Sequence, residues 1–343
     1  MAKSVWGDEA TEYFYDLTPE RILDAVEKSS GLRCTGRAFA LNSLENRVYE
    51  LEIELEQPAK ERADNFRIAK FYRPGRWSKE QIEAEHQFLI ELKENEIPVI
   101  APIPFLDGST IHQLDDSKIY YCLFPKMGGR SPDELTNENL AIIARLLARL
   151  HNVGRTRPAE ARIALTPDSY GRDNLAYLMN NKLIPAHHEQ AFSDVTNEIC
   201  TLSAPLFAKL NYQRVHGDCH LGNLLYGREG FFWVDFDDMV RGPCIQDLWL
   251  LVPGREQEDR NKWLTMLDAY ETMKSFDRSE LLVVEPLRAL RMIHFCAWVG
   301  KRWQDPSFPR AFPDYGSERY WQSLIMDLKD QSQLIKQSYS PLA

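Results

Sequence analysis

The spacing of apolar side chains predicts one helix and then mainly strands in the first third of this chain. The helix start Thr18-Pro19 precedes an apolar stripe that includes Ile22 and Val26 and ends before Gly31. Residues with β-compatible bulk then predict four strands, at 39–41, 47–54, 66–72 and 119–124.

Apolar residues at helical spacing predict three longer helices. Ser78, with Gln81 three residues later, makes a capping-box start for the first of them. Thr136 is placed to cap the second, whose apolar residues recur at i, i+3 and i+7: Leu140, Ile143, Leu147 and Leu150. The third covers residues 279–303 and contains Pro286, which should kink or divide it.

Composition then limits the class of protein. A chain of 343 residues is long enough for two packed lobes, and 44% hydrophobic with 27% charged residues is ordinary for a globular protein. The net charge of −10 disfavours nucleic acid or an anionic membrane as a partner. The six cysteines form no Cys-x-x-Cys pair, and we see neither a secretory signal nor an apolar run that could span a bilayer. We therefore expect a cytoplasmic protein with reduced thiols.

One stretch concentrates polar groups suited to chemistry. His216-Gly217-Asp218 is followed by Asn223, and Asp235 comes directly after an apolar run at 231–234. Val215 and that run are predicted as short strands, so Asp218 and Asn223 would share a loop and Asp235 would end the returning strand. Phosphoryl transfer needs a divalent ion held by oxygen ligands and a carboxylate that faces the attacking hydroxyl, and these three side chains suit both needs.

The pattern H-G-D-x-x-x-x-N, followed by an apolar strand and Asp, resembles the catalytic segment of the aminoglycoside phosphotransferase and choline kinase superfamily, which is related to the protein kinases. Further segments resemble the bacterial stress response kinase A (YihE/RdoA) family, and together they extend the resemblance over nearly the whole chain. These segments are Asn42 to Tyr49, Ala69 to Pro74, Glu85 to Phe88, Gly128 to Arg130, Gly242-Pro243 and Gln246 to Trp249.

The resemblance implies an α+β, two-lobed, protein-kinase-like fold. The small β-rich lobe at 1–125 would bind the nucleotide, and the mainly helical lobe at 126–343 would carry the catalytic loop and the substrate site. It also implies ATP and Mg²⁺ as cofactors and a serine/threonine protein kinase as the activity. Asp218 would act as the base that accepts or orients the hydroxyl proton, while Asn223 and Asp235 would bind the metal.

The resemblance places the nucleotide phosphates near Ser43, Lys70 and Glu85. The turn at 42–46 has no glycine, so the Ser43 hydroxyl and the main chain would make its phosphate contacts; the alternative is a plain polar hairpin turn. Lys70 would pair with the α- and β-phosphates and with Glu85, for which Glu83 is the rival. Without this context, a strand lysine is usually a solvated edge residue.

The hinge between the lobes is expected around Phe124, Lys126 and Met127, whose main chain would hydrogen-bond the adenine. The alternative is a loop with two glycines. On the same resemblance, Asp247 would brace the catalytic loop through backbone N–H groups. Only 247 − 235 = 12 positions separate Asp235 from Asp247, which leaves no room for a long phosphorylatable activation loop.

Several residues near the motif have competing interpretations. His216, Cys219 and His220 resemble a zinc set, but their spacing is cramped and no fourth ligand is evident. Asp237 and Asp238 are read as solvated acids, with a second metal or a cationic substrate as the alternative. His151 is read as a capping or packing residue. Arg288 and Arg291 are candidate substrate contacts.

The leading hypothesis is an ATP- and Mg²⁺-dependent protein-serine/threonine kinase that works as a monomer. The motif chemistry does not distinguish a protein hydroxyl from a small alcohol, so a kinase for an aminoalcohol, a sugar or an aminoglycoside-like molecule is the first alternative. A regulatory pseudokinase is the second alternative, although every expected catalytic group is present.

Overall fold

The computed structural model describes residues 14–342, which divide into two compact units. The first unit contains the described residues up to Ser131 together with Leu224–Asp237 and Asp305–Ser307. The second contains Pro132–Asn223, Asp238–Gln304 and the described residues from Phe308 onward. The sequence predicted a single boundary at residues 125 and 126, whereas the chain passes from one unit to the other more than once.

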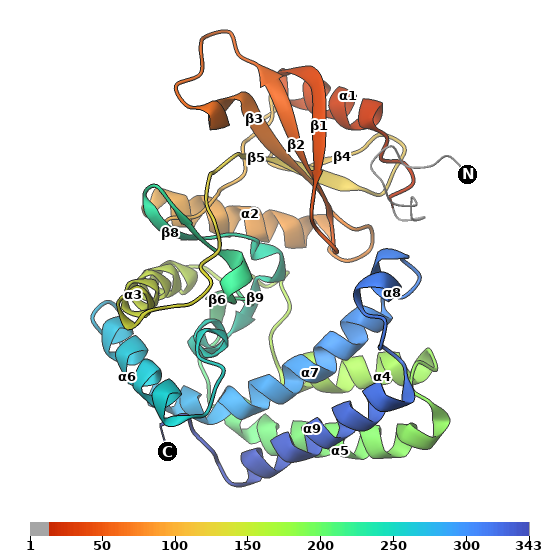
Figure 1. The fold of residues 1–343 in the computed structure, drawn as a ribbon, viewed down its shortest axis with the longest axis vertical. Helices are drawn as coiled ribbons and strands as arrows, with labels where there is room; N and C mark the ends of the chain where they lie inside the picture. The colour runs from red at the N-terminus through yellow and green to blue at the C-terminus, as the bar shows by residue number, and fades with distance from the viewer. Residues whose placement is uncertain (1–13, 343) are drawn as a thin grey trace. The chain divides into compact units, whose positions relative to one another are not determined.

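The first unit is built on an antiparallel sheet in the order β1-β2-β3-β5-β4 (Figure 1). Its strands are β1 Arg33–Leu41, β2 Arg47–Glu54, β3 Phe66–Phe71, β4 His112–Gln113 and β5 Tyr120–Pro125. A hairpin of β7 Leu224–Gly227 and β8 Gly230–Trp233 completes the unit. The sequence predicted β8 but missed β7.

Two helices accompany this sheet, α1 Pro19–Ser30 and α2 Lys79–Glu94. Thr18 caps α1, and Gly31 ends it at φ +70°, a left-handed conformation that glycine adopts without strain. Ser78 and Gln81 form the predicted capping box of α2. Successive side chains of a strand point to opposite faces, so Ala69 and Phe71 pack in the core shared with α1. Lys70 therefore points to the opposite face.

The second unit is mainly helical. Its helices are α3 Asn137–Gly154, α4 Asp173–Asn180, α5 Ala186–Phe207, α6 Gln257–Glu271, α7 Val284–Gly300, α8 Ser307–Ala311 (whose first residue groups with the first unit) and α9 Glu318–Lys336. Helices α5, α7 and α9 lie side by side (Figure 1). A two-stranded ribbon joins β6 Gln213–Val215 to β9 Val240–Gly242. The sequence predicted α3 with its Thr136 cap correctly.

Short 3-10 turns at Cys244–Asp247 and Trp249–Leu251 follow β9, and Asp247 ends the first of them. Pro286 lies in the first turn of α7, after a 3-10 turn at Arg278–Val283, so it divides the predicted run near its start. No helix within residues 14–342 is long and apolar enough to cross a membrane.

Candidate functional site

The predicted catalytic loop begins in the second unit, where strand β6 ends at Val215. Gly217 has φ +89°, and a Cβ atom at this position would lie 2.2 Å from the carbonyl oxygen of Asp238. Both the left-handed backbone and the close approach require glycine. The backbone can therefore turn at Gly217 and bring Asp218 to the start of the loop.

Asp247 braces this loop, as the sequence predicted. Its Oδ2 accepts the N–H of His216 and its Oδ1 accepts the N–H of Gly217, each at 2.8 Å. The buried His151 ring also bonds Asp247 Oδ2 through Nε2 at 3.0 Å, and its Nδ1 lies 2.8 Å from the Tyr270 hydroxyl. His151 is thus a packing histidine, as expected, and it orients the bracing carboxylate.

Asp218 lies among three polar partners. Its carboxylate is 2.8 Å from Arg291 Nη1, 3.2 Å from His220 Nε2 and 3.3 Å from Asn223 Nδ2. Burial raises the pKa of Asp218, but His220 and Arg291 outweigh that effect and hold the pKa below its ordinary value. Asp218 is therefore ionised at neutral pH and is a weak base. Arg291 was predicted only as a candidate substrate contact, and its ion pair with Asp218 was not predicted.

Asn223 ends a 3-10 turn at Leu221–Asn223. Its Nδ2 donates to the main-chain oxygen of Asp218 at 3.0 Å as well as to the Asp218 carboxylate. Both amide hydrogens are used in this way, so Oδ1 is the atom that suits a cation.

In the first unit, Lys70 is the centre of a buried charge cluster. Its Nζ lies 3.1 Å from Asp237 Oδ1, 3.4 Å from Asp235 Oδ1 and 3.7 Å from Glu85 Oε1. Burial lowers the pKa of Lys70, but the three carboxylates raise it well above the ordinary value, so the ammonium stays charged. The predicted pair of Lys70 with Glu85 is present, while the rival Glu83 instead pairs with Lys79 at 3.6 Å.

Asp237 is buried, so its interpretation as a solvated acid is wrong. Its side chain is only 3% exposed, and it pairs with Lys70 and with the Arg76 guanidinium. Its Oδ2 also accepts Nδ2 of the buried Asn46 at 3.2 Å. A run of acids in sequence is usually solvated, but here cations from β3 and the segment after it supply the partners that burial requires.

Asp235 differs from Asp237 in both exposure and backbone. Its side chain is 57% exposed, and its φ of +59° lies in the left-handed region. Aspartate enters this region more readily than most residues, yet the conformation still costs about 1 kcal/mol. Asp235 thus offers Lys70 an exposed carboxylate, whereas Asp237 offers it a buried one.

Arg73 holds the turn that contains Ser43. Its guanidinium donates to the main-chain oxygens of Glu45 at 3.0 Å and Leu44 at 3.1 Å. The same guanidinium also donates from Nη2 to Oδ2 of the fully buried Asp305, at 2.8 Å. A residue from the last seventh of the sequence therefore fixes the arginine that supports the turn, a contact that no local pattern predicted.

The expected hinge residues belong to the end of β5 and the loop after it. Lys126 Nζ pairs with Glu50 Oε2 at 2.7 Å and lies 4.3 Å from the centre of the Phe66 ring. The Lys126 side chain is thus engaged with the sheet, so only its main chain remains available for the adenine contact expected of it. That contact stays a prediction, as it does for Phe124 and Met127.

The zinc alternative at His216, Cys219 and His220 finds no support. Nδ1 of His216 accepts the N–H of Asp218 at 3.2 Å, and Nδ1 of His220 accepts the N–H of Gly222 at 2.9 Å. Burial also raises the pKa of the Cys219 thiol well above its ordinary value, which disfavours the thiolate that would bind zinc.

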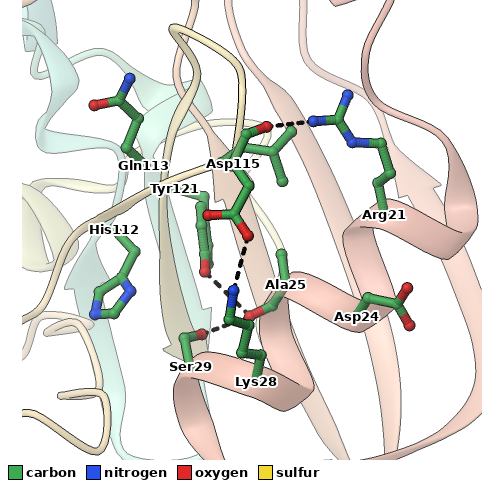
Figure 2. A pocket seen from close by; sticks show the side chains of 10 residues that line it. Arg21, Asp24, Ala25, Lys28, Ser29, His112, Gln113, Asp115 and Tyr121 are labelled. Atoms are coloured by element: carbon green, nitrogen blue, oxygen red, sulfur yellow. Dashed lines mark hydrogen bonds and ion pairs between the residues drawn. The ribbon is translucent and has the colours of Figure 1, made fainter.

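A separate cavity of about 400 Å³ lies in the first unit between α1 and the β4–β5 segment. Lys28 Nζ pairs with Asp115 Oδ2 at 2.8 Å in this cavity, and the Tyr121 hydroxyl donates to the main-chain oxygen of Ala25 (Figure 2). None of the predicted site residues lines it.

Comparison with known proteins agrees with this architecture. The model of the phosphotransferase enzyme family matches residues 40–282. The solved structure of amicoumacin kinase hAmiN, in complex with AMP-PNP, Ca²⁺ and Ami, superposes with a TM-score of 0.70 at 16% identity and covers 94% of each chain. The microcompartment-associated aminopropanol kinase superposes with a TM-score of 0.62 at 19% identity, over 92% of this chain and 96% of that one. The predicted α+β kinase-like fold is confirmed.

The chain belongs to the phosphotransferase enzyme family. Its sequence is 38% identical to "Stress response kinase A" of Salmonella typhi and to "Serine/threonine protein kinase RdoA" of Salmonella typhimurium (strain LT2), over 94% of this chain and 94% of each relative. It is 36% identical to "Stress response kinase A" of Escherichia coli (strain K12), over 94% of this chain and 95% of the relative. Within the family it therefore falls with the stress response kinases, as the sequence motifs predicted, and it is a kinase.

Proposed function

We propose that this kinase transfers the γ-phosphoryl group of Mg²⁺-bound ATP to serine or threonine hydroxyls of proteins in the cytoplasm. The observation that carries the proposal is the cluster around Lys70, in which a buried ammonium faces Glu85, Asp235 and Asp237. This is the lysine and glutamate pair of kinases with two further carboxylates beside it. The printed name of the Salmonella typhimurium relative supports the protein acceptor.

The donor atoms fit a divalent ion with a nucleotide. With Arg76 included, the Lys70 cluster holds two cations and three carboxylates, so its net charge is 2 − 3 = −1 when all are ionised. Mg²⁺ prefers oxygen ligands. The excess negative charge of the cluster and the side-chain Oδ1 of Asn223 both suit it. In the proposal, Asp235 and Asn223 hold the ion, and the ion supplies positive charge to the phosphate oxygens.

The chain's own residues then have distinct tasks. Lys70, oriented by Glu85, binds the α- and β-phosphates, and Ser43 contributes its hydroxyl and main chain to the phosphates. The main chain of Phe124, Lys126 and Met127 binds the adenine. These roles follow the kinase pattern.

Asp218 receives the acceptor hydroxyl. Because His220 and Arg291 keep its pKa low, it contributes mainly by orienting the hydroxyl and accepts the proton late in the transfer. Arg291 keeps the carboxylate in place through its 2.8 Å contact.

The test is phosphate transfer from radiolabelled Mg²⁺-ATP to the protein itself, to model proteins and to a panel of alcohols. Asp218→Asn and Asp235→Ala should each reduce the rate at least about a hundredfold, whereas Asp115→Asn, which breaks an exposed ion pair, should leave it unchanged. Equal transfer by all four proteins would end the proposal. Rapid labelling of one alcohol, with no labelling of any protein, would establish a small-molecule acceptor. If the wild type transfers no phosphate to any acceptor, the pseudokinase is favoured. The monomeric state stays a prediction that light scattering can test.

A further inference from the structure

Two histidines and a glutamate converge on the surface of the second unit, on residues that the kinase chemistry does not use. His187 and His188 lie in the first turn of α5, and Glu318 is the first residue of α9. Nε2 of His187 is 2.8 Å from Glu318 Oε2, and Nε2 of His188 is 2.8 Å from Glu318 Oε1. One potential ligand atom from each residue lies within 4.8 Å of the other two.

The geometry points to a binding site for a zinc-like transition-metal ion formed by His187, His188 and Glu318. Two imidazoles and one carboxylate are a ligand set that proteins use for zinc with a fourth position open to water. Imidazole favours zinc, copper and nickel, whereas Mg²⁺ takes oxygen ligands, so this site would not fill with the ion of the kinase reaction.

The distances between the donors allow this assignment with little movement. Ligands at about 2.0–2.1 Å from a tetrahedral ion stand roughly 3.3 Å from one another. The histidine nitrogens are now 2.8 Å from the Glu318 oxygens, so each contact must open by only about half an ångström. The centres of the two imidazole rings are 4.2 Å apart, so the two histidines are direct neighbours.

The helices that carry the ligands are held in register over their length. Phe192 of α5 packs edge-on against Trp321 of α9, with ring centres 5.5 Å apart. Further along, Glu198 accepts the Ser332 hydroxyl at 2.5 Å and pairs with Lys336 at 2.7 Å. Because packed helices position both ends of the cluster, the ligands are preorganised.

A further contact orients the carboxylate. Gln322, one turn along α9, donates Nε2 to Glu318 Oε1 at 2.7 Å. Contacts of this kind hold metal ligands in place. Both helix N-termini carry partial positive charge, which opposes a cation, so the negative charge of Glu318 is essential to the site. A bound ion would tie the first turns of α5 and α9 together.

The test uses the full chain without a histidine affinity tag, stripped with a chelator and titrated with Zn²⁺ alone. Wild type should bind one ion, and His188→Ala and Glu318→Gln should each weaken binding at least about tenfold. His112→Ala is the matched control, because it removes another partly buried histidine that pairs with a carboxylate, Asp107, at 3.1 Å. It should bind as the wild type does.

Two further measurements keep the outcome decisive. Circular dichroism and Tm without metal show whether each variant folds, and Zn²⁺ should raise Tm only where the three ligands are intact. Co²⁺ should give the visible absorption of a low-coordinate site in the wild type and in His112→Ala, but not in the two ligand variants. Zn²⁺ affinity that is equal in the wild type and both ligand variants, or no saturable binding by the wild type, would overturn the proposal. Neither result depends on phosphoryl transfer.

Discussion

At the scale of single residues, the predicted catalytic loop is held by buried hydrogen bonds at its start. Asp247 uses both carboxylate oxygens to hold consecutive N–H groups of His216 and Gly217, and His151 orients it from the other side. All are buried in the second unit. Removing one partner from such a network leaves the other groups buried without a hydrogen bond, which costs their full desolvation free energy. These positions should therefore tolerate little change.

Gly217→Ala should impair both stability and transfer. The alanine Cβ would meet the Asp238 carbonyl oxygen at 2.2 Å, so the backbone of the loop must move. Gly108→Ala is the control, since Gly108 has φ +81° with no atom within 4 Å of the added Cβ. The control should lose only about 1–2 kcal/mol from backbone strain and keep its rate. Urea unfolding and kcat measure the two effects; equal losses in both variants would contradict the close-contact argument.

Glu280 should make stability depend on pH. Burial raises the pKa of this carboxyl from 4.5 to about 7, although it accepts the N–H of Ile245 at 2.8 Å. The folded protein then holds the proton more tightly than the unfolded chain. The contribution is fully present below pH 4.5 and is lost as pH rises to about 7.

Glu280→Gln tests this, because glutamine accepts the same N–H and does not titrate. The shift in pKa from 4.5 to about 7 corresponds to roughly 3 kcal/mol. The free energy of unfolding of the variant, relative to the wild type, should therefore be higher at pH 8 than at pH 4.5. Urea unfolding of both proteins at the two pH values measures it, and a difference that does not change with pH would refute the assignment.

At the scale of elements, hydrogen bonds with Arg73 hold the turn between β1 and β2 in place. Asn46 accepts the N–H of Arg73 at 3.1 Å, and the Arg73 guanidinium holds two carbonyl oxygens of the turn. Asp305 fixes that guanidinium. Because the turn contains no glycine, its shape depends on these contacts more than on backbone freedom.

Asp305→Asn should therefore weaken ATP binding more than it slows transfer. If looser positioning of the turn costs about 1.4 kcal/mol of binding, KM for ATP rises about tenfold with a much smaller change in kcat. Asp305→Glu should restore part of the loss. Initial rates over a range of ATP concentrations measure it, with Tm to verify folding. A fall in kcat at constant KM would assign Asp305 a different role.

At the scale of the whole molecule, the chain spans nearly the full length of its stress response kinase relatives, yet the segment after Asp235 is short. A 3-10 turn at Phe236–Asp238, strand β9 and a second 3-10 turn at Cys244–Asp247 occupy it. The segment is thus built from paired and packed structure. The segment is too short to contain a long loop whose ordering could act as a switch.

Activity should accordingly be independent of phosphorylation. Treatment of the purified enzyme with a protein phosphatase, followed by removal of the phosphatase, should leave kcat unchanged, because no loop needs a phosphate to become ordered. Mass spectrometry of the intact chain verifies that phosphate is gone. Inactive enzyme that regains its rate on incubation with Mg²⁺-ATP would show that a phosphorylation switch exists.

The sequence by itself determined the features that local chemistry encodes. The capping residues Thr18, Ser78 and Thr136 and the spacing between Lys70 and Glu85 lie within single elements or neighbouring ones, so hydrophobic period and hydrogen-bonding capacity were sufficient. The motif from His216 to Asp235 could likewise be recognised in the sequence, because the chemistry of phosphoryl transfer restricts which side chains can bind the metal or face the attacking hydroxyl.

Only the tertiary structure decided which polar groups are buried and with which partners. Asp237 was misread because its cations, Lys70 and Arg76, lie more than 150 positions earlier in the chain. The support of Asp305 for Arg73 and the approach of His188 to Glu318 were invisible for the same reason. Burial and ion pairing depend on the distances between residues in the folded chain, and no local periodicity records those distances.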